Sequence, residues 1–131
     1  MTGDKQSVFE TILAQDKAAF ERWYQGDPFA YLDIMAEEVT YFSPFANRIL
    51  DGKSTVYAAV APAEGQIHSP GFAIIDPKIQ LGESIAVITF LLSELDEEGA
   101  QTAGWKVTEI CRQVDDNWRI IHLHYSAVSE G

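Results

Sequence analysis

The chain has 131 residues, a formal net charge of −11 and a single cysteine, and hydrophobic residues make up 47% of it. This size and composition indicate a globular protein with one domain, residues 1–131, and no internal disulfide. The negative charge argues against nucleic acid and anionic membranes as partners, and no apolar stretch approaches the roughly 20 residues that cross a bilayer. Because the first residues also lack the features of a secretory signal, a cytoplasmic location is expected.

A long amphipathic helix is predicted at the start of the chain. Ser7 and Glu10 match a capping box, in which the first side chain bonds forward and the second bonds back. Apolar residues then recur at helical spacing as far as Gly26. Asp16 falls on the mostly apolar side of this helix, and we interpret it as a residue at the edge of the apolar stripe.

Shorter elements are expected between this helix and the middle of the chain. A second, short helix is predicted to begin at Asp27-Pro28, since Asp caps helices and Pro suits their first position. A strand over residues 39–43 and a third helix within residues 54–62 follow. Residues 63–70 show no clear period, and we interpret them as a mobile flap. His68 within it is either a solvated loop residue, which is the default, or a residue that closes over a ligand.

The second half of the chain is predicted to consist of strands. Residues 72–81 form one strand, which is bent or bulged at Pro77 because proline cannot donate to a sheet ladder. Residues 85–95 are apolar on both faces and indicate a central strand. A hairpin over residues 103–127 turns at Asp115-Asp116, or one residue later. Helices before antiparallel strands predict an α+β protein, with helices packed on one face of a curved sheet.

The hairpin carries the most informative side chains. Since side chains alternate with period two, its two strands are expected to present one set of residues on a common face. That set is Trp105, Val107, Glu109, Cys111, Trp118, Ile120, His122 and His124. A carboxylate and two imidazoles on an otherwise apolar face predict the lining of a cavity.

Three interpretations of Glu109, His122 and His124 remain open. They could form a catalytic acid–base set, because imidazole titrates near neutral pH and burial raises the pKa of a carboxyl group. They could bind a metal, since two histidines and a carboxylate are a plausible ligand set. They could also be buried polar residues that satisfy one another. We predict a catalytic role for the three residues and no metal site.

Aromatic residues are expected to line the same cavity and to bind a substrate. They are Trp23, Tyr41, Phe45, Tyr57 and Trp105. An aromatic cavity with few polar groups suits a small, largely apolar ligand, and core packing is the alternative role for each ring. The chain has no phosphate loop and no dinucleotide glycine pattern, so no cofactor is expected. Cys111 is interpreted as a small core residue.

The other face of the hairpin is expected to point away from the cavity. Alternation places Ile110, Ile121, Leu123 and Tyr125 there. An apolar outer face needs a cover, and a twofold-related subunit is the usual one. The sequence therefore predicts a homodimer that forms through the outer face of the sheet.

The order of these motifs resembles the nuclear transport factor 2-like superfamily. The resemblance is carried by Gly26-Asp27-Pro28, Val39-Thr40-Tyr41-Phe42, Pro44-Phe45, Leu50-Asp51-Gly52, Trp105, Thr108-Glu109 and the run from Trp118 to Ser126. That last run looks like the small bacterial SnoaL-like proteins. It is also similar to the association domain of calcium/calmodulin-dependent protein kinase II. The resemblance implies a cone-shaped, cystatin-like fold: a strongly curved antiparallel sheet wrapped around a long N-terminal helix, with two shorter helices and an internal pocket.

The chain departs from these families at two places. Steroid isomerases of the superfamily carry a general-base Asp just before a Pro, whereas here Ser43 precedes Pro44. The kinase association domain has an Arg where Glu109 aligns, so its preference for anions does not transfer to this chain.

Two functions follow from the residues and the resemblance. The first is a small-molecule-binding protein, or a cofactor-free enzyme of the isomerase, dehydratase or cyclase type, that transfers protons in the cone pocket. The second is an association module like the kinase domain, which assembles subunits without catalysis.

Overall fold

The computed structural model describes residues 4–128. They form a six-stranded sheet with helices on one side of it. The elements in chain order are α1 (Lys5–Trp23), the 3-10 helix η1 (Tyr31–Ile34), β1 (Met35–Phe42), β2 (Leu50–Asp51), α2 (Lys53–Val60), the 3-10 helix η2 (Ala61–Ala63), β3 (Gly71–Leu81), β4 (Ile85–Leu95), β5 (Gln101–Val114) and β6 (Asn117–Ala127). The predicted α+β class is confirmed. None of the described helices combines the length and the apolar character that a membrane crossing requires.

Helix α1 begins earlier than its predicted capping box. Asp4 is the N-cap, and its carboxylate accepts the backbone N–H of Ser7 at 2.8 Å. The expectation that Ser7 caps the helix is therefore wrong, because a better cap lies three residues ahead of it. The helix ends at Trp23, close to the expected Gly26.

The elements after α1 also differ from expectation. The predicted second helix is only the four-residue η1, after which β1 starts at Met35, four residues before the expected strand. Residues 63–70, which were predicted to form a mobile flap, make two backbone hydrogen bonds: the N–H of Gly65 donates to Gly26 O at 2.8 Å and that of Ser69 to Tyr24 O at 3.1 Å. The segment is thus bonded to the end of α1, and its His68 is exposed.

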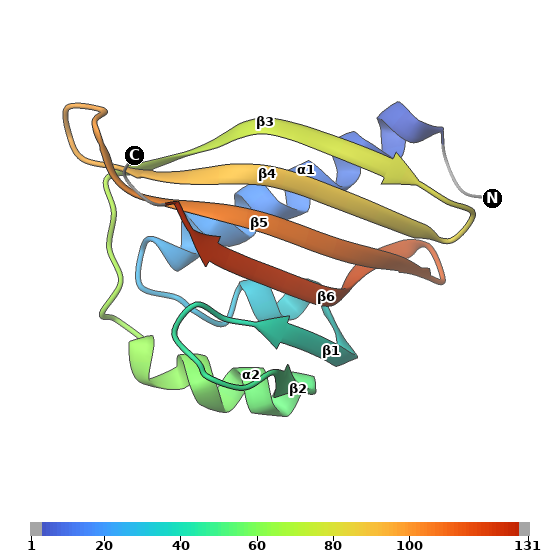
Figure 1. Cartoon of the computed structure of the whole chain (residues 1–131), viewed down its shortest axis with the longest axis horizontal. Coiled ribbons are helices and arrows are strands. Elements are labelled where there is room, and N and C mark those ends of the chain that lie inside the picture. Colours follow the sequence, from blue (N-terminus) through green and yellow to red (C-terminus); the bar gives the residue numbers. More distant parts are fainter. Residues whose placement is uncertain (1–3, 129–131) are drawn as a thin grey trace.

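The strands run in the order β2-β1-β6-β5-β4-β3, which Figure 1 shows from their outer side. Every neighbouring pair is antiparallel except β1 and β6, which are parallel. The hairpin turns at Asp115-Asp116, as predicted, because Val114 pairs with Asn117. The register of β3 shifts around Pro77, where the sequence predicted a bend or bulge.

A second bulge lies in β6 and changes which side chains point inward. Ile110 pairs with His122, whereas the next residue of β5, Cys111, pairs with Ile120. Ile121 is therefore an extra residue, and such a bulge reverses the alternation beyond it. The expectation that His122 and His124 share a face with Glu109 is wrong for this reason: Glu109 pairs with Leu123, and the imidazoles project from the opposite face.

The same bulge corrects the predicted outer face. Leu123 is 2% exposed and belongs to the core, and Tyr125 packs against that core. Neither residue contributes to an outer apolar surface, contrary to expectation. The large apolar side chains that are exposed on the strands instead include Phe42, Ile75, Ile85 and Leu91, from β1, β3 and β4.

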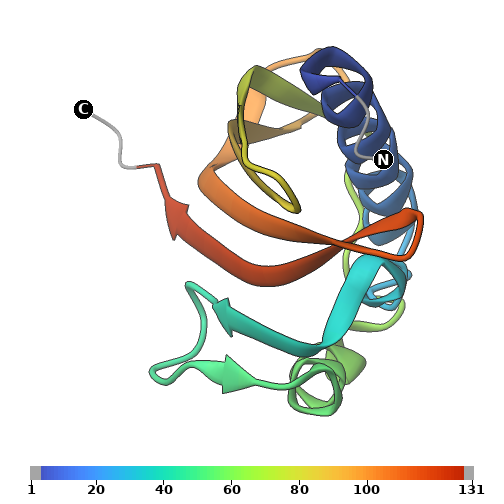
Figure 2. The ribbon, with the colours of Figure 1, turned by 90° about the vertical axis from the view of Figure 1, so that its right-hand side faces the viewer.

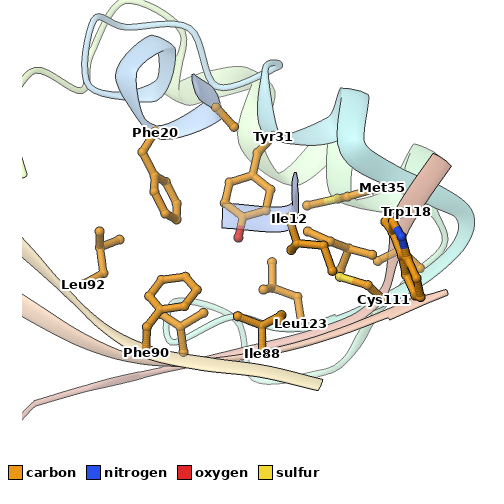
Figure 3. Close-up of a cluster of buried hydrophobic side chains, with 14 of the residues drawn as sticks. Ile12, Phe20, Tyr31, Met35, Ile88, Phe90, Leu92, Cys111, Trp118 and Leu123 are labelled. Atoms are coloured by element: carbon orange, nitrogen blue, oxygen red, sulfur yellow. The ribbon is translucent and has the colours of Figure 1, made fainter. Parts of the chain in front are cut away.

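The core lies between α1 and the concave side of the sheet. Figure 2 shows the sheet bending like an open C, with α1 (blue) across its open side. Helix positions Ile12 and Phe20 meet strand positions Ile88, Phe90 and Leu123, and all five are at most 4% exposed. Burial of each such side chain stabilises the fold by about 1.5–3 kcal/mol. Figure 3 shows Tyr31 extending its hydroxyl into this apolar cluster.

Candidate functional site

Two carboxyl groups are buried between α1 and β5. Asp16 lies four residues from both Ile12 and Phe20, so helical spacing turns it inward with them. Glu109 alternates in phase with the buried Val107 and Cys111, so its carboxyl also faces inward, as predicted. Both residues are 0% exposed. The interpretation of Asp16 as a helix-edge residue is therefore wrong.

Burial favours one shared proton on the two carboxyl groups. Burial raises the pKa of Asp16 well above its ordinary value, and the charge of Glu109 and the hydrogen bond between the two groups raise it further. Burial also raises the pKa of Glu109, although the hydrogen bonds from Asp16 and Tyr31 oppose that rise. No protein group in the described chain donates to the Asp16 oxygens. Asp16 therefore holds the proton and donates it to the Glu109 carboxylate, because two bare carboxylates could not lie together out of water.

Two tyrosines connect this pair to a cavity. The hydroxyl of Tyr31 donates to Oε2 of Glu109. Since that proton is committed, the Tyr31 oxygen is the acceptor of the Tyr125 hydroxyl, which lies 3.4 Å away. Both rings line the cavity. The polar groups thus form a chain, from Asp16 through Glu109 and Tyr31 to Tyr125, that leads from the core to the cavity wall.

The cavity has a volume of about 270 Å³ and an aromatic lining. Its aromatic residues are Phe20, Trp23, Tyr24, Tyr31, Tyr41, Phe45, Trp105 and Tyr125. They come from α1, η1, β5, β6, and β1 with the turn after it. Phe45 is 84% exposed and its ring centroid lies 5.5 Å from that of Trp105, so the cavity meets the surface beside this pair.

One carboxylate belongs to the cavity wall itself. Glu94 lies near the end of β4 and, with Leu92 two residues before it, lines the cavity. Trp105 Nε1 donates to its Oε2 at 3.0 Å, and the Tyr24 hydroxyl donates to the same oxygen at 3.1 Å. The carboxylate is therefore fixed in orientation.

Four of the five predicted aromatic lining residues reach the cavity: Trp23, Tyr41, Phe45 and Trp105. Burial raises the pKa of Tyr41 to about 12, with a hydrogen bond to Ser43 acting in the opposite direction. Tyr57 is not part of the described lining. It is 53% exposed and stacks on Phe29 at a centroid distance of 5.0 Å.

The two histidines lie on the outer face with Phe42. His122 Nδ1 is 2.8 Å from Thr40 Oγ1, and the ring of the exposed His124 is 5.2 Å from that of Phe42. Burial lowers the pKa of His122, and the proximity of His124 lowers it further. Neither imidazole is brought to Glu109. Among residues 4–128, no three His, Cys, Asp or Glu side chains are placed to hold a metal ion.

The sequence analysis did not assign Asp16, Glu94, Tyr31 or Tyr125 to this site. Asp16 and Glu94 carried a usable signal, because each continues the spacing of buried neighbours on its own element. Tyr125 was assigned to the wrong face because the bulge at Ile121 has no signature in the sequence. Tyr31 had no signal beyond its aromatic ring.

Solved structures with the same fold include proteins of several kinds. A candidate ketosteroid isomerase from Parabacteroides distasonis is 27% identical, with a TM-score of 0.78 over 93% of this chain and 89% of that one. An NTF2-like protein of unknown function from Pseudomonas putida is 18% identical, with a TM-score of 0.81 over 98% and 92%. A candidate calcium/calmodulin-dependent protein kinase II association domain from Xanthomonas campestris is 18% identical, with a TM-score of 0.71 over 99% and 91%.

The cystatin-like fold that the family resemblance implied is confirmed, since similar solved structures include proteins described as having that fold. None of the curated proteins compared with the chain matched it. The SnoaL-like domain matches residues 14–130, which cover almost the whole chain. The chain therefore belongs to the SnoaL-like family, within the nuclear transport factor 2-like superfamily.

Proposed function

We propose that this protein binds a small, largely apolar molecule in the aromatic cavity and moves a proton to and from it. The observation that carries the proposal is the hydrogen-bonded chain that joins a buried carboxyl pair to the cavity wall through Tyr31 and Tyr125. A volume of about 270 Å³ lies near the lower end of the range for ligand sites, which suits a compact ligand.

The direction of the hydrogen bonds makes Glu109 the base. A ligand C–H proton would pass to the Tyr125 oxygen, while the Tyr125 proton moves to Tyr31 and the Tyr31 proton moves to Glu109. The carboxyl pair would then hold two protons instead of one. Reversal of the same shifts would return a proton to a different atom of the ligand, which is an isomerisation. The raised pKa of Glu109 favours such a role, since a base works best when its pKa is near the working pH.

The proposal keeps Glu109 from the sequence-based catalytic set and leaves out His122 and His124. Both histidines lie on the outer face, away from the chain of hydroxyl groups. Trp23, Tyr41, Phe45 and Trp105 are proposed to contact the ligand, whereas Tyr57 is not.

Binding and proton transfer can be tested separately. A panel of small aromatic and alicyclic compounds is screened by NMR, with the indole N–H signals of Trp23 and Trp105 as reporters of the cavity. Compounds that bind are then incubated in D₂O, and exchange of their C–H protons is followed. Wild-type protein should catalyse exchange. Glu109→Gln should bind the same compounds but exchange them about 10²–10⁴-fold more slowly, which is the usual worth of a general base.

Two variants sharpen this test. Tyr125→Phe interrupts the proposed chain at the cavity wall and should slow exchange, whereas His124→Ala alters only the outer face and should leave exchange unchanged. Unchanged exchange in Tyr125→Phe, or loss of exchange in His124→Ala, would contradict the assignment. If no compound shifts the tryptophan signals, the binding function itself is wrong.

Assembly through the outer face is a second candidate function. Phe42 and Leu91 are 43% and 42% exposed on that face, and structures of similar fold include kinase association domains. An apolar sheet surface of this kind favours a second copy of the chain, as in a homodimer. Light scattering should give twice the monomer mass for wild type and the monomer mass for Phe42→Glu combined with Leu91→Glu. A wild-type monomer at micromolar concentration would reject this function.

A further inference from the structure

Glu94 in the cavity wall carries a negative charge, and no other described lining residue neutralises it. Glu94 is half-buried there, and both of its donors, Trp105 Nε1 and the Tyr24 hydroxyl, bind the same oxygen. Its Oε1 accepts neither of these hydrogen bonds and is available as an acceptor. Among the described residues that line the cavity, none is Lys, Arg or His. A half-buried carboxylate without a cation beside it favours a ligand that supplies one.

Two hydroxyl groups of the wall are also acceptors, not donors, toward a ligand, because their protons are used within the protein. Tyr31 gives its proton to Glu109, and Tyr125 gives its proton to Tyr31, so neither of these two lining residues has a hydroxyl proton left to donate to a ligand. Behind these rings the Asp16–Glu109 pair holds one negative charge. An anionic ligand would be repelled by both charges, and a ligand that only accepts hydrogen bonds would find few partners among these groups.

Aromatic rings supply the remaining surface. Eight of the residues that line the cavity are Phe, Trp or Tyr. The negative faces of aromatic rings attract organic cations, most strongly where water is excluded. Trp105 combines the two features, since its ring lines the cavity while its indole N–H orients the Glu94 carboxylate. A carboxylate within an aromatic enclosure is the chemical complement of a protonated amine.

We propose that the ligand of this cavity is a small organic cation, an amine whose ammonium group pairs with Glu94 while its apolar body contacts the surrounding rings. This inference rests on the proposed function, because it names the class of molecule that the cavity binds. It also suits the proposed chemistry, since a positively charged nitrogen acidifies the C–H bonds beside it. The net charge of −11 acts in the same direction by drawing cations to the protein.

Three probes of one size and different charge test the inference: benzylamine, benzyl alcohol and benzoate. Affinities are measured by NMR titration of the Trp105 indole signal near neutral pH, where the amine is protonated. Benzylamine should bind wild-type protein about tenfold more tightly than benzyl alcohol, and benzoate should bind more weakly than either.

Two variants assign the preference to one residue. Glu94→Gln keeps the shape of the side chain but removes its charge, so benzylamine should bind it no more tightly than benzyl alcohol does. Glu97→Gln makes the same change of net charge at an exposed position in the β4–β5 turn and should leave all three affinities unchanged. Benzyl alcohol also serves as the folding control, since an intact Glu94→Gln cavity should still bind it.

The outcomes distinguish failure of this inference about the ligand class from failure of the proposed binding function. If benzyl alcohol binds wild type as tightly as benzylamine, or if Glu94→Gln keeps the preference for the amine, the ligand class is wrong while the cavity remains a binding site. If none of the three probes binds, the proposed binding function fails as well. Salt gives a check that needs no variant: the affinity for benzylamine should fall as ionic strength rises and that for benzyl alcohol should not, and equal salt dependence would overturn the inference.

Discussion

Both faces of the β5–β6 hairpin carry titratable groups, and the two faces differ in what surrounds these groups. On the inner face, Glu109 is fully buried beside Asp16 and bonded to Tyr31. On the outer face, His122 and His124 lie beside Phe42, partly or fully open to solvent. The inner groups are linked to a cavity, and the outer groups are linked to a surface that a second subunit could cover.

This difference shows that the side of the sheet, rather than the residue type, decides which groups can act on a ligand. Imidazole is the side chain best suited to proton transfer near neutral pH, yet here the imidazoles face away from the cavity. Carboxyl groups, whose ordinary pKa is too low for that task, are brought closer to it by burial. The comparison can be tested one face at a time.

The largest change in the free energy of unfolding is expected from truncation of a core residue in β6, compared with truncation of its neighbour on the opposite face of the sheet. Leu123→Ala should lower the free energy of unfolding by about 2–5 kcal/mol, because it leaves a cavity in the core. His124→Ala, one residue further on, should change it by no more than about 0.5 kcal/mol, because the ring is exposed. Urea denaturation measures both. Equal losses from the two variants would contradict the observed register.

An intermediate effect on the free energy of unfolding is expected from the proton that Asp16 and Glu109 share. Because the pKa of Asp16 is raised, the folded protein keeps a proton that the unfolded chain releases above about pH 4. The contribution of Asp16 to stability is therefore complete below that pH and is lost as the pH rises through the raised value. Asp16→Asn needs no proton, so its stability relative to wild type should improve by about 1–3 kcal/mol between about pH 5 and pH 9.

Urea midpoints across that pH range measure the change. Asp116→Asn, in the exposed hairpin turn, makes the same change of side chain outside the buried pair and is the matched control, which should not reproduce this improvement. A flat difference between Asp16→Asn and wild type would show that the buried pair does not hold a shared proton.

The smallest change in the free energy of unfolding is expected from a substitution on the outer face. Phe42→Ala removes the ring that covers His122 and should raise the pKa of that imidazole back toward its ordinary value, since burial is the main cause of its lowered pKa. The ring proton signals of His122 report the titration by NMR. Phe42 is 43% exposed, so the unfolding free energy should fall by less than about 1 kcal/mol. An unchanged or lower pKa in the variant would contradict this account.

Much of the fold could be predicted from local patterns. The strand over Ile85–Leu95 has the expected bounds, the hairpin turns at Asp115-Asp116, and the register shift falls at Pro77. These features are governed by neighbours in the sequence: alternation, turn chemistry and the missing N–H of proline. The short helix predicted at Asp27-Pro28 was reduced to a single 3-10 turn because β1 begins sooner than its apolar pattern suggested.

The site was less predictable because it depends on contacts between distant elements. Glu109 could be oriented from its own strand, but its partner Asp16 is on a helix 93 residues earlier, and their proximity follows only from packing. Histidines on a strand with Trp118 and Ile120 were expected to face inward, and a single unpaired residue reversed them. A bulge of this kind arises from pairing with a neighbouring strand, so it cannot be predicted from the sequence of the strand that contains it.

The bulge at Ile121 also has a mechanical consequence. Two residues of β6 occupy the space of one, and a strand with such an insertion bends and twists more strongly. Removal of Ile121 would restore regular pairing from Cys111–Ile120 directly to Ile110–His122 and would leave each remaining side chain on its present side. What the shorter protein would lose is curvature, and a flatter sheet lies closer to the helix across it. One inserted amino acid thus helps to hold open the hollow that the aromatic rings surround.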